Sequence, residues 1–342
     1  MKQLLLKLAM LFIAIYVTIF FYIEIFPLYY NSLNNNRWYF LQKVLSKEID
    51  IKNPNKLFLG ESRVNAGIDI NQFPNAWSVA TGGATAIEMY YALQKFTNNY
   101  QKPDTIFLSL SPRSLTTVYS FWEFAVRNNF FTHKEFMEIY KNSEQLENHL
   151  LIGHTIFTEE DREKNTDTES NRKITPPLLL YFSYLCNYPA HYQVDIHNSL
   201  LFGAKKQNLE MIQEMTQWRG RQNHPELTKG SSGKNYETEM TQFQPSPLLD
   251  FYFYKILQYC KENNIFLIFT SLPMNNTSCE VLNTTFVTEY KTYLQNAQQL
   301  YPEFYISDTI INYPDKYFGD PSHLNQEGRI LYTEYLKNQI FK

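Results

Sequence analysis

The first thirty residues contain an uninterrupted apolar stretch. Residues 8–23 read LAMLFIAIYVTIFFYI without a charge, and apolar neighbours extend the stretch to roughly the 20 residues with which a helix crosses a bilayer. The stretch is apolar on every face, unlike a helix that packs one face against a core. No small-x-small cleavage site follows it, so we expect an uncleaved transmembrane anchor over residues 1–30 rather than a removed signal peptide or a core helix.

The residues on either side of this stretch predict its orientation. Lys2 and Lys7 precede it, and Tyr29 and Tyr30 lie at its far end. Lysines on a short N-terminal segment favour the cytoplasmic side, and tyrosines favour the membrane interface. We therefore expect a single-pass protein whose remaining chain lies outside the cytoplasm.

Short apolar runs alternate with helical patterns in the rest of the chain. The runs of strand length are residues 56–59, 76–80, 104–111, 264–271 and 303–307. Helical spacing occurs at residues 36–48, 84–96, 249–262, 286–300 and 326–341. Continuous apolar strands that alternate with helices favour a parallel sheet covered on both faces. We expect an α/β domain over residues 55–342, preceded at residues 31–54 by a juxtamembrane helix and linker.

The alternation fails between about residues 116 and 248. This region contains helical pieces, the polar stretch EEDREKNTDTESNRK and the loop KGSSGKN. A separate domain would need its own alternation of core-forming segments, which is not evident here. We interpret the region as a largely helical insertion or cap on the sheet.

Composition and charge exclude several classes of function. The 342 residues are 44% hydrophobic and carry a formal net charge of −3, so no basic surface for nucleic acid is expected. The three cysteines lie far apart and form neither a disulfide framework nor a zinc pattern. His191, Asp195 and His197 have a spacing that metal ligands use, but no further ligand is evident beyond them. We expect no metal and no cofactor.

Two short motifs follow the first two predicted strands. The sequence G-E-S-R at residues 60–63 lies where ligands bind in open parallel sheets, at the carboxyl end of a strand. A helix that begins near Ser62 would direct free N–H groups at a developing oxyanion. Gly82 and Gly83 follow the second strand, where glycine lets the backbone approach a substrate and donate an N–H. Each motif alone is more typical of an ordinary turn, with Ser62 as a helix N-cap in the first.

A third motif lies just before the last predicted helix. The sequence D-P-S-H-L-N places Asp320 three residues before His323. A nucleophilic serine needs a base, and the base needs an orienting carboxylate. This pair reaches Ser62 if the last strand belongs to the same sheet. The alternative is that His323 caps the final helix.

Together, the three motifs resemble the conserved blocks of the SGNH/GDSL hydrolase superfamily. The first block of that family usually reads Gly-Asp-Ser, the second contains a glycine, and the last reads Asp-x-x-His. The resemblance covers roughly residues 55–112 and 249–342. It implies a flavodoxin-like three-layer αβα sandwich with a parallel sheet, and a Ser-His-Asp site for acyl transfer.

The resemblance also implies a role for each residue of the site. Ser62 would be the nucleophile, His323 its base and Asp320 the orienting carboxylate. The backbone amides of Ser62, Gly82 and Gly83 would form the oxyanion hole.

The chain departs from the family after the third strand. The third block of the family normally supplies an asparagine to the oxyanion hole, whereas residues 109–113 read S-L-S-P-R. Loss of one such donor costs roughly 10²–10³ in rate. Ser111 and Arg113 are the candidates to replace it. We also include Arg63 among the residues expected to contact the substrate, and Arg113 suits an anionic acceptor.

With the predicted anchor, the chain is similar to membrane-anchored members of the family in the bacterial cell envelope. These include the D-alanine-transfer protein of teichoic acids and the O-acetylation proteins of alginate and peptidoglycan. The resemblance implies acyl transfer, usually of acetyl, from a membrane-bound O-acyltransferase partner to an envelope polysaccharide. It places the chain in the bacterial inner membrane, with its catalytic domain in the periplasm or outside the cell. An envelope carbohydrate esterase and a catalytically silent glycan-binding or assembly subunit are the alternatives.

Overall fold

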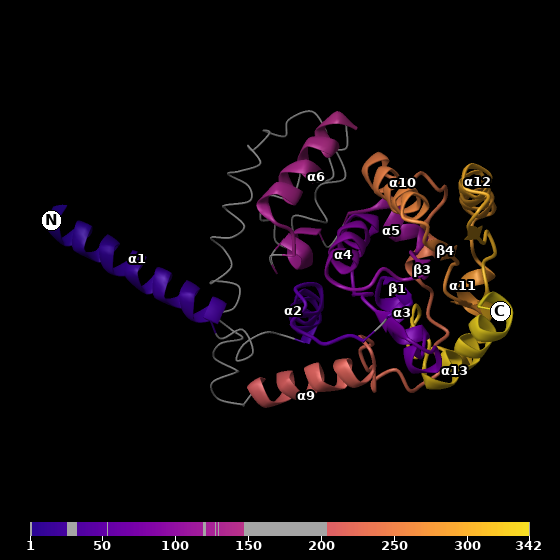
Figure 1. Ribbon diagram of the computed structural model, residues 1–342, viewed down its shortest axis with the longest axis horizontal. Coiled ribbons are helices and arrows are strands. Elements are labelled where there is room, and N and C mark those ends of the chain that lie inside the picture. Colours follow the sequence, from indigo (N-terminus) through magenta and orange to yellow (C-terminus); the bar gives the residue numbers. More distant parts are fainter. Residues whose placement is uncertain are drawn as a thin grey trace.

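A parallel sheet forms the centre of the domain. The computed structural model describes residues 2–25, 33–52, 54–118, 121–126, 128, 130–146 and 204–341. Its main sheet has five strands in the order β2-β1-β3-β4-β6. Figure 1 shows β1, β3 and β4 among the surrounding helices. The strands are β1 (Lys56–Gly60), β2 (Ala76–Ser78), β3 (Thr105–Ser109), β4 (Phe266–Phe269) and β6 (Tyr305–Ile306). The predicted α/β class with a parallel sheet is confirmed, and each predicted strand segment contains a strand.

The strand order creates a reversal at β1. The register places Lys56 beside Ala76 of β2 on one side and beside Thr105 of β3 on the other. The chain therefore first moves to one side of β1 and then continues on the opposite side. This order is consistent with a flavodoxin-like fold, in which ligands bind at the carboxyl ends of the strands near the reversal.

Alternate side chains of the strands pack into two separate hydrophobic cores. In β1, Leu57 and Leu59 belong to the larger core, whereas Phe58 belongs to the smaller one, and all three side chains are fully buried. Ile106 and Phe107 of β3 divide between the two cores in the same way. Since successive side chains of a strand point to opposite faces, helices must cover both faces of this sheet.

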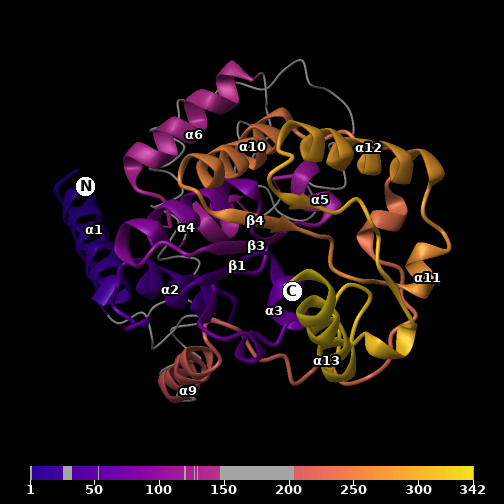
Figure 2. The ribbon, with the colours of Figure 1, turned by 45° about the vertical axis from the view of Figure 1, so that its right-hand side comes forward.

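Helices do cover both faces, as Figure 2 shows. The larger core contains residues of α2 (Leu33–Leu45), α4 (Ala86–Asn99), α10 (Pro247–Glu262) and α12 (Thr284–Leu300). The smaller core contains residues of α3 (Ser62–Gly67), α13 (Gln326–Tyr335) and the π-helical turn η8 (Leu336–Ile340). Helices therefore form at each of the predicted helical segments of the domain.

The helix α2 is part of this domain, because a buried arginine attaches it to the sheet. Arg37 donates from Nε to the carbonyl of Ala80 at 2.9 Å and from Nη1 to the carbonyl of Gly220. Burial lowers the pKa of Arg37 to about 9. Its neighbour Trp38 is 2% exposed and packs edge-on against Phe130. The segment that follows the predicted anchor is thus packed into the core.

The N-terminal helix differs from the others in its exposure. Many large apolar side chains of α1 (Lys2–Ile25), from Leu4 to Phe21, are between 43% and 76% exposed. Among the residues that the structure describes, no helix is both long enough and apolar enough to cross a membrane, so the predicted transmembrane helix is not confirmed.

The region predicted as an insertion contributes helices and a short turn to the described structure. Its described helices include α6 (His133–Gln145) and α9 (Ala204–Gln217), and the short turn η6 (Tyr236–Glu239) follows. Residues 147–203 lie outside the described residues. The candidate metal ligands His191, Asp195 and His197 fall within that range.

We predict that Gly60→Ala destabilises the domain. Gly60 has a φ of +146°, and a Cβ at this position would lie 2.3 Å from the carbonyl oxygen of Ser109 on the neighbouring strand. The strain and the clash together should lower the free energy of unfolding by about 3 kcal/mol. Urea denaturation measures this loss.

Gly82→Ala is the matched control. A Cβ at Gly82 would meet only the Cβ of Ser62, at an ordinary contact distance of 3.8 Å. Equal stability of the two variants would contradict the assignment of Gly60 as a required close approach between β1 and β3.

Candidate active site

Ser62 lies at the carboxyl end of the central strand β1. Glu61 is the N-cap of α3, and its carboxylate accepts a hydrogen bond from the backbone N–H of Arg63 at 3.2 Å. Ser62 is therefore the first residue of α3, directly after the strand. The position at the carboxyl end of a strand is the one expected from the sequence, and the structure shows that the strand order reverses there.

Asp320 and His323 lie on a loop whose shape is maintained by its own hydrogen bonds. Oδ1 of Asp320 accepts from the backbone N–H groups of Ser322 and His323, both at 2.8 Å. The N–H of Gly319 donates to the carbonyl of His323 at 2.9 Å, which closes the loop. Asn325, not His323, is the N-cap of α13. The alternative role of His323 as a helix cap is therefore wrong.

A second set of contacts attaches this loop to the body of the domain. Asp315 begins the short turn η7 (Asp315–Tyr317), and its carboxylate accepts from the backbone N–H and the hydroxyl of Thr277 at 3.1 and 2.6 Å. Nearby, β5 (Met274–Asn275) pairs with β7 (Asn312–Tyr313). The loop is thus fixed to the segment that follows β4.

The structure brings Ser62, His323 and Asp320 into one hydrogen-bonded line. Oγ of Ser62 lies 2.8 Å from Nε2 of His323. Nδ1 of His323 lies 2.7 and 3.0 Å from the two carboxylate oxygens of Asp320. Burial acts to raise the pKa of Asp320, but the hydrogen bonds and charge of His323, with the backbone N–H groups of the loop, lower it overall. Asp320 is therefore an ionised acceptor at neutral pH.

Two of the three predicted oxyanion-hole residues lie side by side. Gly82 approaches Ser62 closely, because a Cβ on Gly82 would be 3.8 Å from that of Ser62. The N–H of Thr81 donates to the carbonyl of Gly60 at 3.0 Å and so attaches this loop to the end of β1. Within the described ranges, the N–H groups of Ser62 and Gly82 have no hydrogen-bond acceptor. Gly83 follows with a φ of +75°.

Arg63 is held by a carboxylate from the predicted insertion. Its Nη2 donates to both carboxylate oxygens of Glu237, at 2.7 and 2.8 Å, and its Nε lies 3.6 Å from Oε1 of Glu61. Arg63 is 9% exposed and Glu237 is fully buried. This ion pair holds Arg63 beside Glu61, and Arg63 also lines a cavity, so its expected contact with a substrate stays a prediction.

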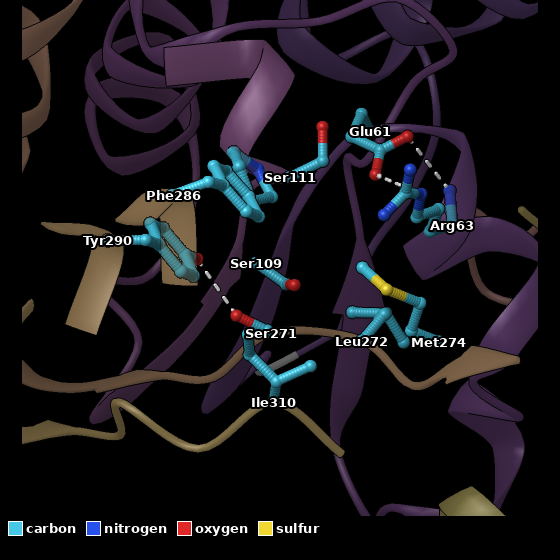
Figure 3. Close-up of a pocket in the computed structure, with 11 residues that line it drawn as sticks. Glu61, Arg63, Ser109, Ser111, Ser271, Leu272, Met274, Phe286, Tyr290 and Ile310 are labelled. Carbon is cyan, nitrogen blue, oxygen red and sulfur yellow. Dashed lines mark hydrogen bonds and ion pairs between the residues drawn. The ribbon is translucent and has the colours of Figure 1, made fainter. Parts of the chain in front are cut away.

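A cavity lies next to Glu61 and Arg63, at the carboxyl ends of β1, β3 and β4. Figure 3 shows serine hydroxyls and apolar side chains around it, with Oγ of Ser271 2.9 Å from the hydroxyl of Tyr290. The other residues that line it are Ser109, Ser111, Pro112, Leu272, Met274, Phe286 and Ile310. Ser111 is the only candidate substrate residue after β3 that lines this cavity.

Ser111 and Arg113 each have a local structural contact. Oγ of Ser111 accepts from the N–H of Ser114 at 3.2 Å and so caps α5 (Pro112–Thr116). The guanidinium of Arg113 lies 4.1 Å from the ring centroid of Tyr236, which is 59% exposed. The sequence predicted no role for Tyr236 because it lies in the unmatched region.

Two further residues lie near Ser62, His323 and Asp320 and were not predicted from the sequence. The ring of His224 lies 6.5 Å from that of His323, with an angle of 19° between the planes. Burial lowers the pKa of His224, and the nearby Glu226 offsets this only in part. The second missed residue is Glu237. Neither residue belongs to a recognisable motif, so no local signal in the sequence could have identified them.

Comparisons with known proteins were made at the level of both sequence and structure. No family model matches the chain, and no curated protein or solved structure matches it. Within the described ranges, no group of three or more His, Cys, Asp or Glu side chains could hold a metal ion.

The geometry supports nucleophilic chemistry at Ser62. An imidazole within 2.8 Å of a hydroxyl can accept its proton, and an ionised carboxylate on the opposite nitrogen holds the required tautomer. The adjacent N–H groups of Ser62 and Gly82 have the chemistry of an oxyanion hole.

We predict that Glu237→Ala destabilises the domain, because it leaves the buried guanidinium of Arg63 without its bidentate partner. Removal of one member of a buried ion pair typically costs about 3–5 kcal/mol. Urea denaturation measures the change in the free energy of unfolding. Glu239→Ala, on the exposed side of the same short turn, should change it by less than about 0.5 kcal/mol. Similar values for both variants would show that the ion pair does not stabilise the site.

Proposed function

We propose that the chain is a serine acyltransferase of the SGNH/GDSL type that forms an acyl-enzyme on Ser62. The observation that carries the proposal is the hydrogen-bonded line from Ser62 through His323 to Asp320 at the carboxyl end of β1. The N–H groups beside Ser62 support it, because the transition state of acyl transfer develops negative charge at that place.

In the proposed mechanism, His323 first acts as a base and then as an acid. It accepts the proton of Ser62 while Oγ attacks the acyl carbonyl, and Asp320 stabilises the imidazolium that forms. The tetrahedral oxyanion lies between the N–H groups of Ser62 and Gly82. His323 returns the proton to the leaving group, and the acyl ester of Ser62 remains. An acceptor hydroxyl then attacks this ester, and His323 again accepts the proton.

The proposed substrates are an acyl donor and a polysaccharide of the bacterial cell envelope. Support comes from the resemblance of the three motifs to envelope O-acetylation proteins, which favours acetyl as the group transferred. By the same resemblance, a membrane-bound O-acyltransferase is the proposed donor partner. The half-buried guanidinium of Arg113 lies against the exposed ring of Tyr236, and a guanidinium beside an aromatic face suits an anionic sugar.

The proposed location is the bacterial inner membrane, with the catalytic domain in the periplasm or outside the cell. Support comes from the charge-free sequence of residues 8–23 and from the exposed apolar side chains of α1. Such a surface is unfavourable in water and favours association with lipid.

Two observations favour other functions for the same fold. Ser62 and His323 are partly exposed, so water could reach an acyl-enzyme, as in an envelope carbohydrate esterase. The asparagine that the family places after β3 is absent, as expected for a catalytically silent glycan-binding or assembly subunit.

We predict that the purified chain is acetylated on Ser62 by an activated acetyl ester. Ser62→Ala should abolish the adduct, and His323→Ala should slow its formation by about 10³-fold or more. Intact-mass spectrometry detects the adduct, and a glycan acceptor distinguishes transfer from hydrolysis. His133→Ala, at the start of α6, is the control and should react like the unmodified chain. Equal reaction of all variants would contradict the proposed chemistry.

We also predict that the chain fractionates with membranes and resists an alkaline wash. A chain that begins at residue 31 should move to the soluble fraction. Ile13→Asp tests the apolar surface in the full chain, since a carboxylate at a lipid-facing position costs about 3 kcal/mol. Immunodetection after fractionation measures both changes, and a full chain found in the soluble fraction would contradict the proposed location.

A further inference from the structure

Ser62 contacts a second acceptor besides His323. Its Oγ lies 2.8 Å from Nε2 of His323 and 2.9 Å from Oε2 of Glu61. The hydroxyl has one proton, so it can donate to only one of these atoms at a time.

The number of protons in this cluster can be counted from the acceptors. Asp320 is ionised and can only accept, so Nδ1 of His323 carries a hydrogen. If His323 is neutral, Nε2 then has no hydrogen, and the cluster of Oε2, Oγ and Nε2 contains only the serine proton. Two contacts of 2.8 and 2.9 Å need two hydrogens. With a single hydrogen in the cluster, one of the two contacts would bring two lone pairs together, which is unfavourable.

The surroundings of Glu61 determine where the second proton is bound. Oε2 accepts from the backbone N–H of Arg63 at 3.2 Å, and Oε1 lies 3.6 Å from its Nε. Both partners are N–H groups, so the carboxylate oxygens act as acceptors in these contacts. Nε2 of His323 is the remaining atom that can hold a proton and donate it to Ser62.

We propose that Glu61 is a catalytic residue that competes with His323 for the Ser62 proton and so stabilises a resting site with one additional proton on His323. In this state Nε2 donates to Oγ of Ser62, and Oγ donates to Glu61. The inference rests on the proposed function, because it describes how the same serine is activated.

The additional proton prevents catalysis until it leaves. A protonated His323 cannot accept the proton of Ser62, so the first step is release of the Nε2 proton to solvent. Ser62 then donates to Nε2, and Glu61 retains its contacts with Arg63. No other bond forms or breaks in this step. The acylation rate should therefore rise with pH as the resting site loses its proton.

Several other charged groups face this cluster and are unchanged by a substitution at Glu61. Asp320 contacts Nδ1 of His323, and the ring of His224 lies 6.5 Å from that of His323. Nδ1 of His224 in turn lies 2.9 Å from Glu226. Glu237 forms an ion pair with Arg63 at 2.7 Å. A change in the pH profile of a Glu61 variant can therefore be assigned to Glu61.

Glu61→Gln is the decisive variant. Its amide oxygen can keep the hydrogen bond from the Arg63 N–H, but it carries no charge and so stabilises an additional proton on His323 less than the carboxylate does. Glu61→Asp is the second variant, because Asp also caps helices but is one methylene shorter and should not reach Ser62. Glu303→Gln removes an exposed carboxylate elsewhere and serves as the control.

The experiment measures the rate of Ser62 acetylation by an activated acetyl ester between about pH 5 and 9, with the full chain in detergent. We expect the half-maximal rate of Glu61→Gln and Glu61→Asp to occur at a pH lower by about one unit or more than in the unmodified chain. The profile of Glu303→Gln should not move. Coincident profiles for all four proteins would overturn the inference.

A second measurement separates this inference from the proposed function. The ¹⁵N NMR signals of His323, assigned by comparison with His323→Gln, report the proton on Nε2 whether or not the chain is active. Retention of that proton to higher pH in the unmodified chain than in Glu61→Gln supports the inference, and identical titrations overturn it. Acetylation that is independent of Ser62 overturns the proposed function alone.

Discussion

The pairing of β1 with a strand on each side is the constraint on which the rest of the structure depends. Because β1 pairs with β2 on one side and with β3 on the other, neither of its edges is open, and its carboxyl end lies at the reversal of the strand order. Gly60 allows β1 to end in close approach to β3, and the chain turns directly into α3 with Ser62 as its first residue. Because the strands are parallel, the loop after β2 also lies at this end of the sheet, where Gly82 approaches Ser62.

A series of charged contacts connects the predicted insertion with the nucleophile. Glu237 holds Arg63, Arg63 lies beside Glu61, and Glu61 contacts Ser62. Burying such charges costs solvation energy, so the pair of Arg63 and Glu237 contributes more to the position of Glu61 than to net stability. A region that resembles no block of the family thus determines the environment of the serine.

Much of the fold could be predicted because its signals are local. Strands that are buried on both faces appear in the sequence as continuous apolar runs, and helices have apolar residues every three or four positions. The predicted segments for β1, β3 and α10 therefore end close to the observed ends of these elements. The order of the strands in the sheet was expected only from the family resemblance, because pairing depends on contacts between segments that lie far apart in the chain. The packing of α2 through Arg37 and the carbonyl of Ala80 could not be read from the sequence, because an arginine in a polar segment is usually exposed.

The candidate site divides in the same way. The sequence by itself determined the residue types and their order: a serine after the first strand, glycines after the second, and Asp320 three residues before His323. Only the tertiary structure decided that Oγ of Ser62 contacts a histidine 261 residues away. It also decided that Asn325 caps the last helix. Glu61, Glu237 and His224 lie around Ser62, His323 and Asp320 for the same reason. The physical reason is that a motif specifies chemistry over a few residues, whereas hydrogen bonds and ion pairs form between whichever groups the packed strands and helices bring within about 3 Å.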